Sequence, residues 1–180
     1  MAVVTILGAG VMGSAMCMPL SDRGHEVRLV GTHLDGAIID SVKASGRHPK
    51  LNATLPGGIA AFRHDEFKQA LGEDTDVILL GVSSAGMEWA IGQLCTALPG
   101  PASVLMITKG MKPEAATLAS LPDHVKQTVR ARREIDLAVA AIGGPCIAGE
   151  LAARRHTGTV ITSHDQAFAF WTVRRSMRFS

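Results

Sequence analysis

The sequence predicts an α/β fold in which a doubly wound, mostly parallel β-sheet is covered by helices on both faces. Three observations support this prediction. Segments with the periodicity of strands and of helices alternate along the whole chain. Residues 77–80 read Val-Ile-Leu-Leu and are apolar on both faces, as a buried parallel strand requires. Glycine and proline separate the segments, for example at residues 99–101.

The first strand is expected at residues 3–7, and G-A-G-V-M-G follows directly at residues 8–13, where a helix begins. A G-x-G-x-x-G sequence between a strand and a helix is the fingerprint of a Rossmann-type dinucleotide site. Gly8 would let the chain turn out of the strand, Gly10 would let a pyrophosphate approach the backbone, and Gly13 would let the helix pack closely. The N–H groups at the start of the helix would bind the phosphates.

The second strand, expected at residues 26–30, ends without the acidic residue that usually holds the adenosine ribose of NAD. The chain continues with Gly31, Thr32 and His33, and the first acid is Asp35. The arginine expected for NADP is also missing. Thr32 or His33 could hydrogen-bond the ribose. We predict NAD as the cofactor, with NADP as the alternative.

The remaining elements follow from periodicity, capping residues and breakers. Further helices are expected at residues 11–23, 34–44, 65–71, 85–98, 147–153 and 164–174, and further strands at 59–62, 76–82, 103–108, 137–142, 157–162 and 177–179. Residues 47–58 contain several glycines and prolines and are predicted to form a loop. Pro113 suits a first helical position, which predicts another helix beginning at Glu114.

Composition fits one domain of this class. The chain has 180 residues, of which 47% are hydrophobic, and a net charge of +2. These values do not indicate binding to nucleic acid, and no apolar run reaches the ~18 residues of a membrane span. The three cysteines form no C-x-x-C, and the seven histidines have no metal-ligand spacing. We therefore expect a cytoplasmic chain with reduced thiols and without a metal site.

Four loops follow the carboxyl ends of predicted strands, at residues 8–13, 82–84, 109–110 and 143–146. Ligands of doubly wound sheets bind beyond these ends, so we expect the four loops to meet in one crevice. Lys109 would project toward the nicotinamide end of a cofactor. Its ammonium could stabilise a developing alkoxide, bind a phosphate or transfer a proton. The alternative is an exposed lysine without a function.

Other candidate residues have simpler interpretations. Residues 143–150 form a glycine-rich turn that opens a helix, which suits an anion or a hydroxyl but is also common as a plain turn. Cys146 has no identifiable His or Asp partner, so we do not expect a nucleophile. Among the histidines, only His33 and His48 are candidates, as cofactor contacts.

With these motifs in place, the chain resembles the nucleotide-binding domain of the NAD(P)-dependent glycerol-3-phosphate dehydrogenase family, from Met1 to about Ser180. The features that match in order are G-A-G-x-x-G at 8–13, Leu-Pro at 55–56, T-K-G at 108–110 and G-P-x-x-A-x-E at 144–150. The last two are the most specific. The resemblance implies that residues 1–180 form a dinucleotide-binding domain.

The resemblance also implies roles for individual residues. Lys109 is the implied catalytic residue. The implied cofactor-binding residues are Gly8, Gly10, Val11, Met12, Gly13, Thr32, His33, Val82, Lys109 and Ala148, and the implied substrate-binding residues are Lys109, Gly144 and Cys146. The chain departs from the family at Cys146, where serine is usual, at Ser83, where proline is usual, and at Thr32, where arginine is common. These departures concern the substrate and cofactor more than the fold.

Members of this family continue into an all-helical domain that supplies further catalytic groups. The resemblance therefore implies a fragment or truncated product of a two-domain enzyme that interconverts sn-glycerol 3-phosphate and dihydroxyacetone phosphate. Its implied partners are a small phosphorylated substrate and the helical domain, and the fragment alone would bind dinucleotide but turn over little. One alternative is another Rossmann dehydrogenase, of the ketopantoate-reductase or opine-forming type. Another is a non-catalytic dinucleotide-binding module, whose uncovered apolar face could form a homodimer.

Overall fold

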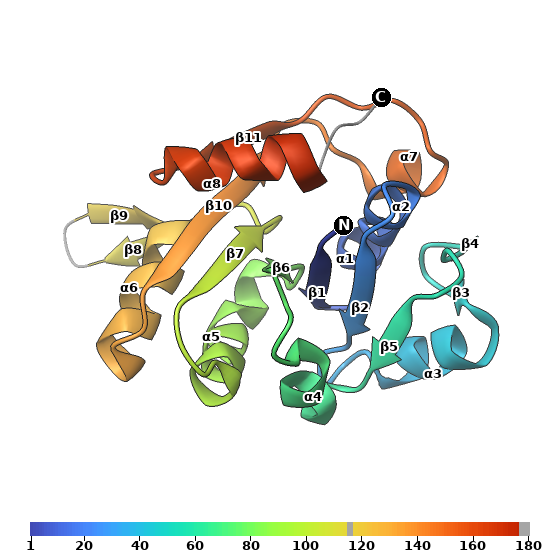
Figure 1. Ribbon diagram of the computed structural model, residues 1–180, viewed down its shortest axis with the longest axis horizontal. Helices are drawn as coiled ribbons and strands as arrows, with labels where there is room; N and C mark the ends of the chain where they lie inside the picture. Colours follow the sequence, from blue (N-terminus) through green and yellow to red (C-terminus); the bar gives the residue numbers. More distant parts are fainter. Residues whose placement is uncertain (115–116, 177–180) are drawn as a thin grey trace.

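A seven-stranded sheet forms the centre of the computed structural model, which describes residues 1–114 and 117–176 (Figure 1). The strand expected at residues 177–179 lies outside these residues. The strands of the sheet are β1 (Val3–Leu7), β2 (Glu26–Val30), β5 (Ala60–Phe62), β6 (Val77–Leu80), β7 (Ala102–Met106), β10 (Leu137–Gly143) and β11 (Val160–Ser163). Their order is β11-β10-β7-β6-β1-β2-β5. β1 and β2 have the predicted bounds.

The sheet is parallel except at one edge, where β11 pairs antiparallel with β10. The registered pair Gly143 and Val160 places the start of β11 beside the end of β10. The connecting helix α7 (Ala148–Ala152) has five residues and is about 8 Å long, whereas β10 spans roughly 23 Å. So short a helix cannot return the chain to the amino end of the sheet, and the chain turns back along β10 instead.

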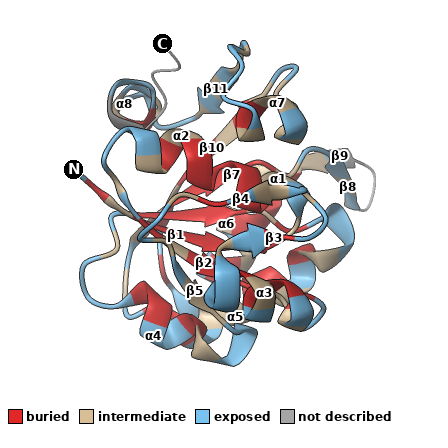
Figure 2. Ribbon diagram, turned by 90° about the vertical axis from the view of Figure 1, so that its right-hand side faces the viewer, coloured by how far each residue is buried: buried red, intermediate tan, exposed pale blue. Residues whose placement is uncertain are grey.

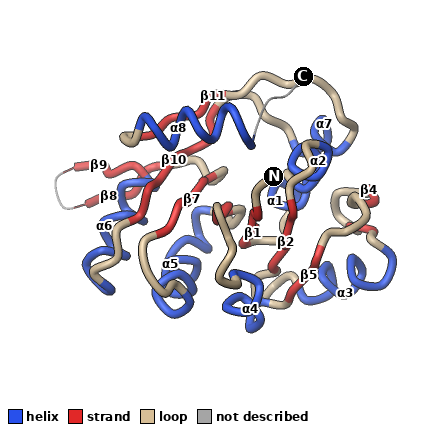
Figure 3. The backbone as a smooth tube through the Cα atoms, viewed as in Figure 1, coloured by secondary structure: helices blue, strands red, loops and turns tan. Residues whose placement is uncertain are grey.

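Helices cover both faces of the sheet, and the alternation can be followed in Figure 3. The helices are α1 (Val11–Ala15), α2 (Cys17–Asp22), α3 (Gly36–Ser45), α4 (Phe67–Leu71), α5 (Met87–Ala97), α6 (Leu121–Arg133), α7 and α8 (Gln166–Trp171), with short turns at His64–Glu66, Ser84–Gly86 and Thr172–Ser176. One core packs the sheet against α1, α2, α3, α7 and α8, and the other packs it against α4, α5 and α6. Leu79 lies in the first core and Leu80 in the second, so β6 is buried on both faces as predicted. Figure 2 shows that the centre of the sheet is buried.

The helix predicted at residues 11–23 is interrupted at Met16, between α1 and α2. Pro19 lies inside α2 and has no N–H, so the carbonyl of Ala15 loses the partner it would have four residues later. The interruption therefore follows from a proline within an otherwise helical pattern.

The helix predicted from Glu114 is wrong. Residues Met111–Glu114 and Thr117–Ser120 form strands β8 and β9 of an antiparallel hairpin, in which Pro113 is registered with Leu118. Helix α6 begins only at Leu121. There Ser120 Oγ accepts a hydrogen bond of 3.2 Å from the N–H of Asp123, and a proline stands in the first turn. The capping signal lies here and not at Pro113.

The loop predicted at residues 47–58 contains a second small hairpin, formed by β3 (Arg47–His48) and β4 (Ala53–Thr54). Leu55 N–H donates a 2.8 Å hydrogen bond to the carbonyl of Gly46, so the hairpin closes against the end of α3. Strands of two residues give no periodicity that a sequence pattern could reveal.

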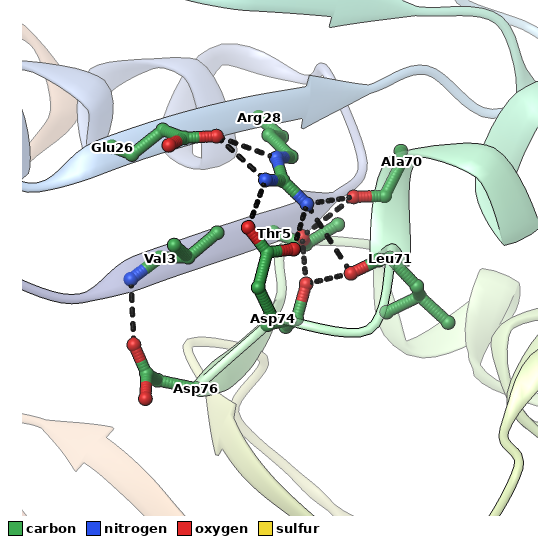
Figure 4. Close-up of polar contacts among 9 residues, drawn as sticks. Val3, Thr5, Glu26, Arg28, Ala70, Leu71, Asp74 and Asp76 are labelled. Carbon is green, nitrogen blue, oxygen red and sulfur yellow. Dashed lines mark hydrogen bonds and ion pairs between the residues drawn. The ribbon is translucent and has the colours of Figure 1, made fainter.

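A polar cluster holds α4 and the loop after it against the sheet (Figure 4). Arg28 donates two hydrogen bonds of 2.8 Å to the carboxylate of Asp74 and one of 3.1 Å to the carbonyl of Ala70. The Arg28 guanidinium holds the pKa of Asp74 below its usual range through these hydrogen bonds. Asp76 accepts a 2.8 Å hydrogen bond from the N–H of Val3. We infer a structural role for this cluster.

Within residues 1–114 and 117–176, no helix is both long enough and apolar enough to cross a lipid bilayer.

Candidate functional site

The glycine-rich loop between β1 and α1 has the geometry of a phosphate-binding turn. Gly8 has a φ of +117°, and a Cβ on it would lie 2.7 Å from the carbonyl carbon of Gly81. A Cβ on Gly13 would lie 2.1 Å from the carbonyl oxygen of Gly8. A Cβ on Gly10 would meet no atom of the described residues within 4 Å. Gly8 and Gly13 are therefore needed for the bend and the packing, whereas the space over Gly10 is open to a ligand.

His48 lies beneath this loop and is completely buried. Its Nε2 is 2.9 Å from the carbonyl oxygen of Ala9, and its Nδ1 is 2.9 Å from the amide nitrogen of Leu51. A side chain without exposed surface cannot touch a ligand in the crevice. The expectation that His48 contacts the cofactor directly is therefore wrong in this conformation.

The end of β2 is organised by the buried Asp35, whose Oδ2 accepts hydrogen bonds from Thr32 N–H at 2.9 Å and Thr32 Oγ1 at 2.8 Å. Its carboxylate thus turns into the loop. His33 is exposed and contacts Trp89 of α5, with ring centroids 5.7 Å apart and an edge-on angle of 62°. Sequence reasoning missed Trp89, because only the fold brings α5 beside the end of β2.

The loops expected to converge do meet at the carboxyl ends of the strands, around a cavity of about 340 Å³. Its lining residues are Met12, Val82, Ser83, Ser84, Ile107, Thr108, Lys109, Ile142 and Cys146. A larger cavity of about 580 Å³ lies at the other end of the strands, where Asp76, Ser103 and Leu137 help to line it. We assign the candidate site to the smaller cavity. This cavity adjoins the glycine-rich loop, and one lysine is among the residues that line it.

Two hydrogen bonds connect the loops around this cavity. Lys109 Nζ donates to the carbonyl of Gly144 at 2.7 Å, and Thr108 Oγ1 donates to the carbonyl of Val82 at 2.6 Å. Gly144 has a φ of +87°, which favours glycine. The Lys109 side chain therefore connects the loop after β7 to the loop after β10.

Cys146 lines the same cavity and is a free, half-buried thiol. Burial raises the pKa of Cys146, and the positive charge of Lys109 opposes this increase only in part. The thiol is therefore protonated at neutral pH and can donate a weak hydrogen bond, but it is not an activated nucleophile.

The predicted site residues occupy four places. Met12, Val82, Lys109 and Cys146 line the cavity, and Gly144 is linked to it through Lys109. Gly8 and Gly10 form the turn beside it and Val11 and Gly13 begin α1, while Thr32 and His33 lie at the end of β2, next to β1 in the sheet. Ala148 begins α7 and packs against a core. The arrangement suits an extended ligand that crosses the end of β1.

A protein-family model described as NAD-dependent glycerol-3-phosphate dehydrogenase N-terminus matches residues 3–169. The NADP(+)-dependent glycerol-3-phosphate dehydrogenase of Archaeoglobus fulgidus is 36% identical over 93% of this chain and 48% of its own length. A glycerol-3-phosphate dehydrogenase [NAD(P)+] of Shouchella clausii is 28% identical over 94% of this chain and 48% of its own length.

Among solved structures, glycerol-3-phosphate dehydrogenase of Coxiella burnetii superposes with a TM-score of 0.80. It is 24% identical to this chain, and the match covers 98% of this chain and 51% of that one. At this level of identity the likeness concerns the fold. The chain spans about half the length of the curated relatives it matches.

Proposed function

The chain belongs to the family described as the N-terminus of NAD-dependent glycerol-3-phosphate dehydrogenase, and from this premise we propose that it is the dinucleotide-binding domain of an oxidoreductase acting on a CH–OH group. The proposed reaction interconverts sn-glycerol 3-phosphate and dihydroxyacetone phosphate. Relatives named as glycerol-3-phosphate dehydrogenases, which match more than nine-tenths of the chain, support the proposed substrate.

The position of Lys109 relative to the glycine-rich loop carries this proposal. Met12, at the start of α1 directly after that loop, and Lys109, in the loop after β7, line the same cavity. The open space over Gly10 fits a pyrophosphate, because nothing in residues 1–114 and 117–176 lies within 4 Å of where its Cβ would be. A dinucleotide that lay with its pyrophosphate over Gly10 would extend its nicotinamide toward Lys109. The residues present therefore fit NAD or NADP.

The nicotinamide, when bound, supplies or accepts the hydride. Lys109 would exchange its hydrogen bond to the Gly144 carbonyl for one to the oxygen on C2 of the substrate. There its ammonium would stabilise the negative charge that develops on that oxygen. Apolar side chains of the cavity, such as Val82 and Ile142, would exclude water from the reacting atoms. The thiol of Cys146 would take the place of a hydroxyl beside the substrate.

We further propose that the remaining half of the relatives' length corresponds to a segment that completes the active site with the general acid and base. This chain would then bind dinucleotide but catalyse the reaction poorly. A turnover by residues 1–180 equal to that of a full-length relative would refute this part of the proposal.

We propose NAD as the cofactor, with NADP also accepted. The Asp35 carboxylate is buried and hydrogen-bonded to Thr32. It is therefore not placed to accept a hydrogen bond from a ribose hydroxyl, and it would not repel a 2′-phosphate. Such a site lacks the usual basis for strong selection between the two cofactors.

Calorimetric titration of the purified chain with NADH and with NADPH tests the proposal. We expect both to bind, and Lys109→Met to bind dihydroxyacetone phosphate more weakly than wild type does in the presence of NADH. Lys68→Met is the matched control, because Lys68 is exposed on α4. The proposed function is wrong if neither dinucleotide binds.

A further inference from the structure

We propose that His48 is a positioning residue for the dinucleotide, acting through the peptide between Ala9 and Gly10 without touching the ligand. The inference rests on the proposed function, because it concerns the glycine-rich loop of the same site. His48 ends β3, far along the chain from this loop, and the fold alone brings the two together.

The two hydrogen bonds of His48 fix its protonation state. Leu51 N–H can only donate, so Nδ1 must accept and carries no proton. The carbonyl of Ala9 can only accept, so Nε2 must carry the proton and donate. His48 is therefore a neutral imidazole with its proton on Nε2, and both ring nitrogens are satisfied inside the core.

The hydrogen bond to Ala9 sets the direction of the next N–H group. The Ala9 carbonyl and the Gly10 N–H belong to one planar trans peptide, in which the two bonds point in opposite directions. Because His48 holds the oxygen on the buried side, the N–H of Gly10 must point away from the core. It then faces outward, toward the side from which a pyrophosphate would approach.

The peptide between Ala9 and Gly10 needs an external restraint, because Ala9 has a glycine on each side. Ala9 lies between Gly8, which has a φ of +117°, and Gly10, whose Cβ position is empty. Glycine offers little resistance to rotation of the adjoining peptide planes. Without His48 the Ala9–Gly10 peptide would sample several orientations, and a ligand would have to order it on binding.

His48 is not needed to attach its own hairpin. Leu55 N–H donates to Gly46 at 2.8 Å, and Ser41 Oγ donates to the carbonyl of Arg47 at 2.8 Å. The side chain of Leu55 is also buried in the core beside α3. The hairpin therefore has its own anchors, and the bond from His48 to Ala9 acts mainly on the loop.

Two substitutions of His48 test the roles of its two ring nitrogens separately. His48→Gln places an amide N–H near the position of Nε2 and can still donate to Ala9. His48→Asn places an amide oxygen near Nδ1, so it can still accept from Leu51 but cannot reach Ala9. Each variant loses one buried hydrogen bond, so we expect similar decreases in Tm. We expect His48→Asn to weaken NADH binding about tenfold, which is about 1.4 kcal/mol, and His48→Gln to stay within about threefold of wild type.

Calorimetric titration with NADH, together with thermal unfolding of each variant, decides between the outcomes. Equal affinities of the two variants, while wild type binds, would overturn the role of His48 and leave the proposed function standing. Failure of wild type to bind would refute both.

Wild-type protein provides a second measurement if a variant does not fold. The ¹⁵N spectrum of the imidazole should show a protonated Nε2 and an unprotonated Nδ1 in His48, and NADH should slow the exchange of the Nε2 proton. The opposite tautomer, or exchange that NADH leaves unchanged, would also overturn the inference.

Discussion

Gly13→Ala tests whether close packing of backbone on backbone holds the glycine-rich loop in shape. A Cβ at this position would lie 2.1 Å from the carbonyl oxygen of Gly8, whereas real Cβ atoms essentially never come closer than 3.0 Å. The helix would have to move by about 0.9 Å relative to the turn. The Cβ is fixed rigidly to the backbone of α1 and the oxygen belongs to the main chain, so no side-chain rotation can relieve the overlap.

The expected loss of stability follows from two opposing effects. Overpacking in a core costs about 1–3 kcal/mol, and a backbone contact falls at the upper end of this range. The preference of helices for alanine over glycine offsets up to about 1 kcal/mol. The net loss for Gly13→Ala is therefore about 2 kcal/mol, which lowers Tm by roughly 4–8 °C in a chain of this size.

Two further glycine variants are matched controls for Gly13→Ala. Gly92 lies inside α5, and a Cβ there would meet nothing within 4 Å, so Gly92→Ala should raise stability by about 0.5–1 kcal/mol. Gly10 has a φ of −67° and the same empty surroundings, so Gly10→Ala should unfold like wild type but bind NADH more weakly. Urea unfolding and NADH titration of the three variants provide the measurements. The packing argument is refuted if Gly13→Ala is as stable as wild type and binds NADH equally well.

Two other predictions concern the corner formed by α5, α6 and the β8–β9 hairpin. Glu88 accepts hydrogen bonds from Lys112 and from His124, the second at 2.8 Å, and these lower its pKa from 4.5 to about 2. A carboxylate with a lowered folded-state pKa contributes stability above pH 4.5 that is lost as pH falls toward 2. Because its side chain is 53% exposed, the contribution is below about 1 kcal/mol. Glu88→Gln should flatten the dependence of Tm on pH in this window, and an unchanged slope would contradict the assignment. Ser120→Ala should remove the cap of α6 and cost about 1 kcal/mol in urea unfolding, while Pro113→Ala should leave the helix intact. If Pro113→Ala lowered the stability more than Ser120→Ala did, the result would instead support the helix start predicted at Glu114.

Strong periodicity explains where sequence reasoning succeeded in the fold. The strands at residues 3–7 and 26–30 were predicted with their observed bounds, because each is rich in apolar residues and is followed directly by a glycine. Buried strands such as β6 were recognised for the same reason, although their ends differed by one or two residues. These signals are local, since side chains within one element carry them.

Competing local signals explain the failures. Pro113 and Pro122 both suit the start of a helix, and only the second follows a serine that caps one. The antiparallel course of β11 depends on the length of α7 relative to β10, which a list of alternating segments does not contain. Such outcomes depend on how elements fit together in space.

Prediction of the candidate site divides in the same way. The positions of Met12, Val82, Lys109 and Cys146 followed from the rule that parallel strands present their carboxyl ends at one edge, and these residues line one cavity. The contact of Trp89 with His33 and the burial of His48 under Ala9 had no sequence signal. Each joins elements that are distant in the chain.

The sequence by itself determined the class of fold, the glycine-rich turn and the family to which the chain belongs. Short motifs and the periodicity of apolar residues are enough to indicate all three. Only the tertiary structure decided which polar groups are exposed to a ligand and which are buried to support it. His48 was a candidate cofactor contact in the sequence, yet it is buried and hydrogen-bonds within the protein, as does Asp35 at the end of β2. Burial and hydrogen-bond partners depend on neighbours that the folded chain supplies, and no local pattern specifies them.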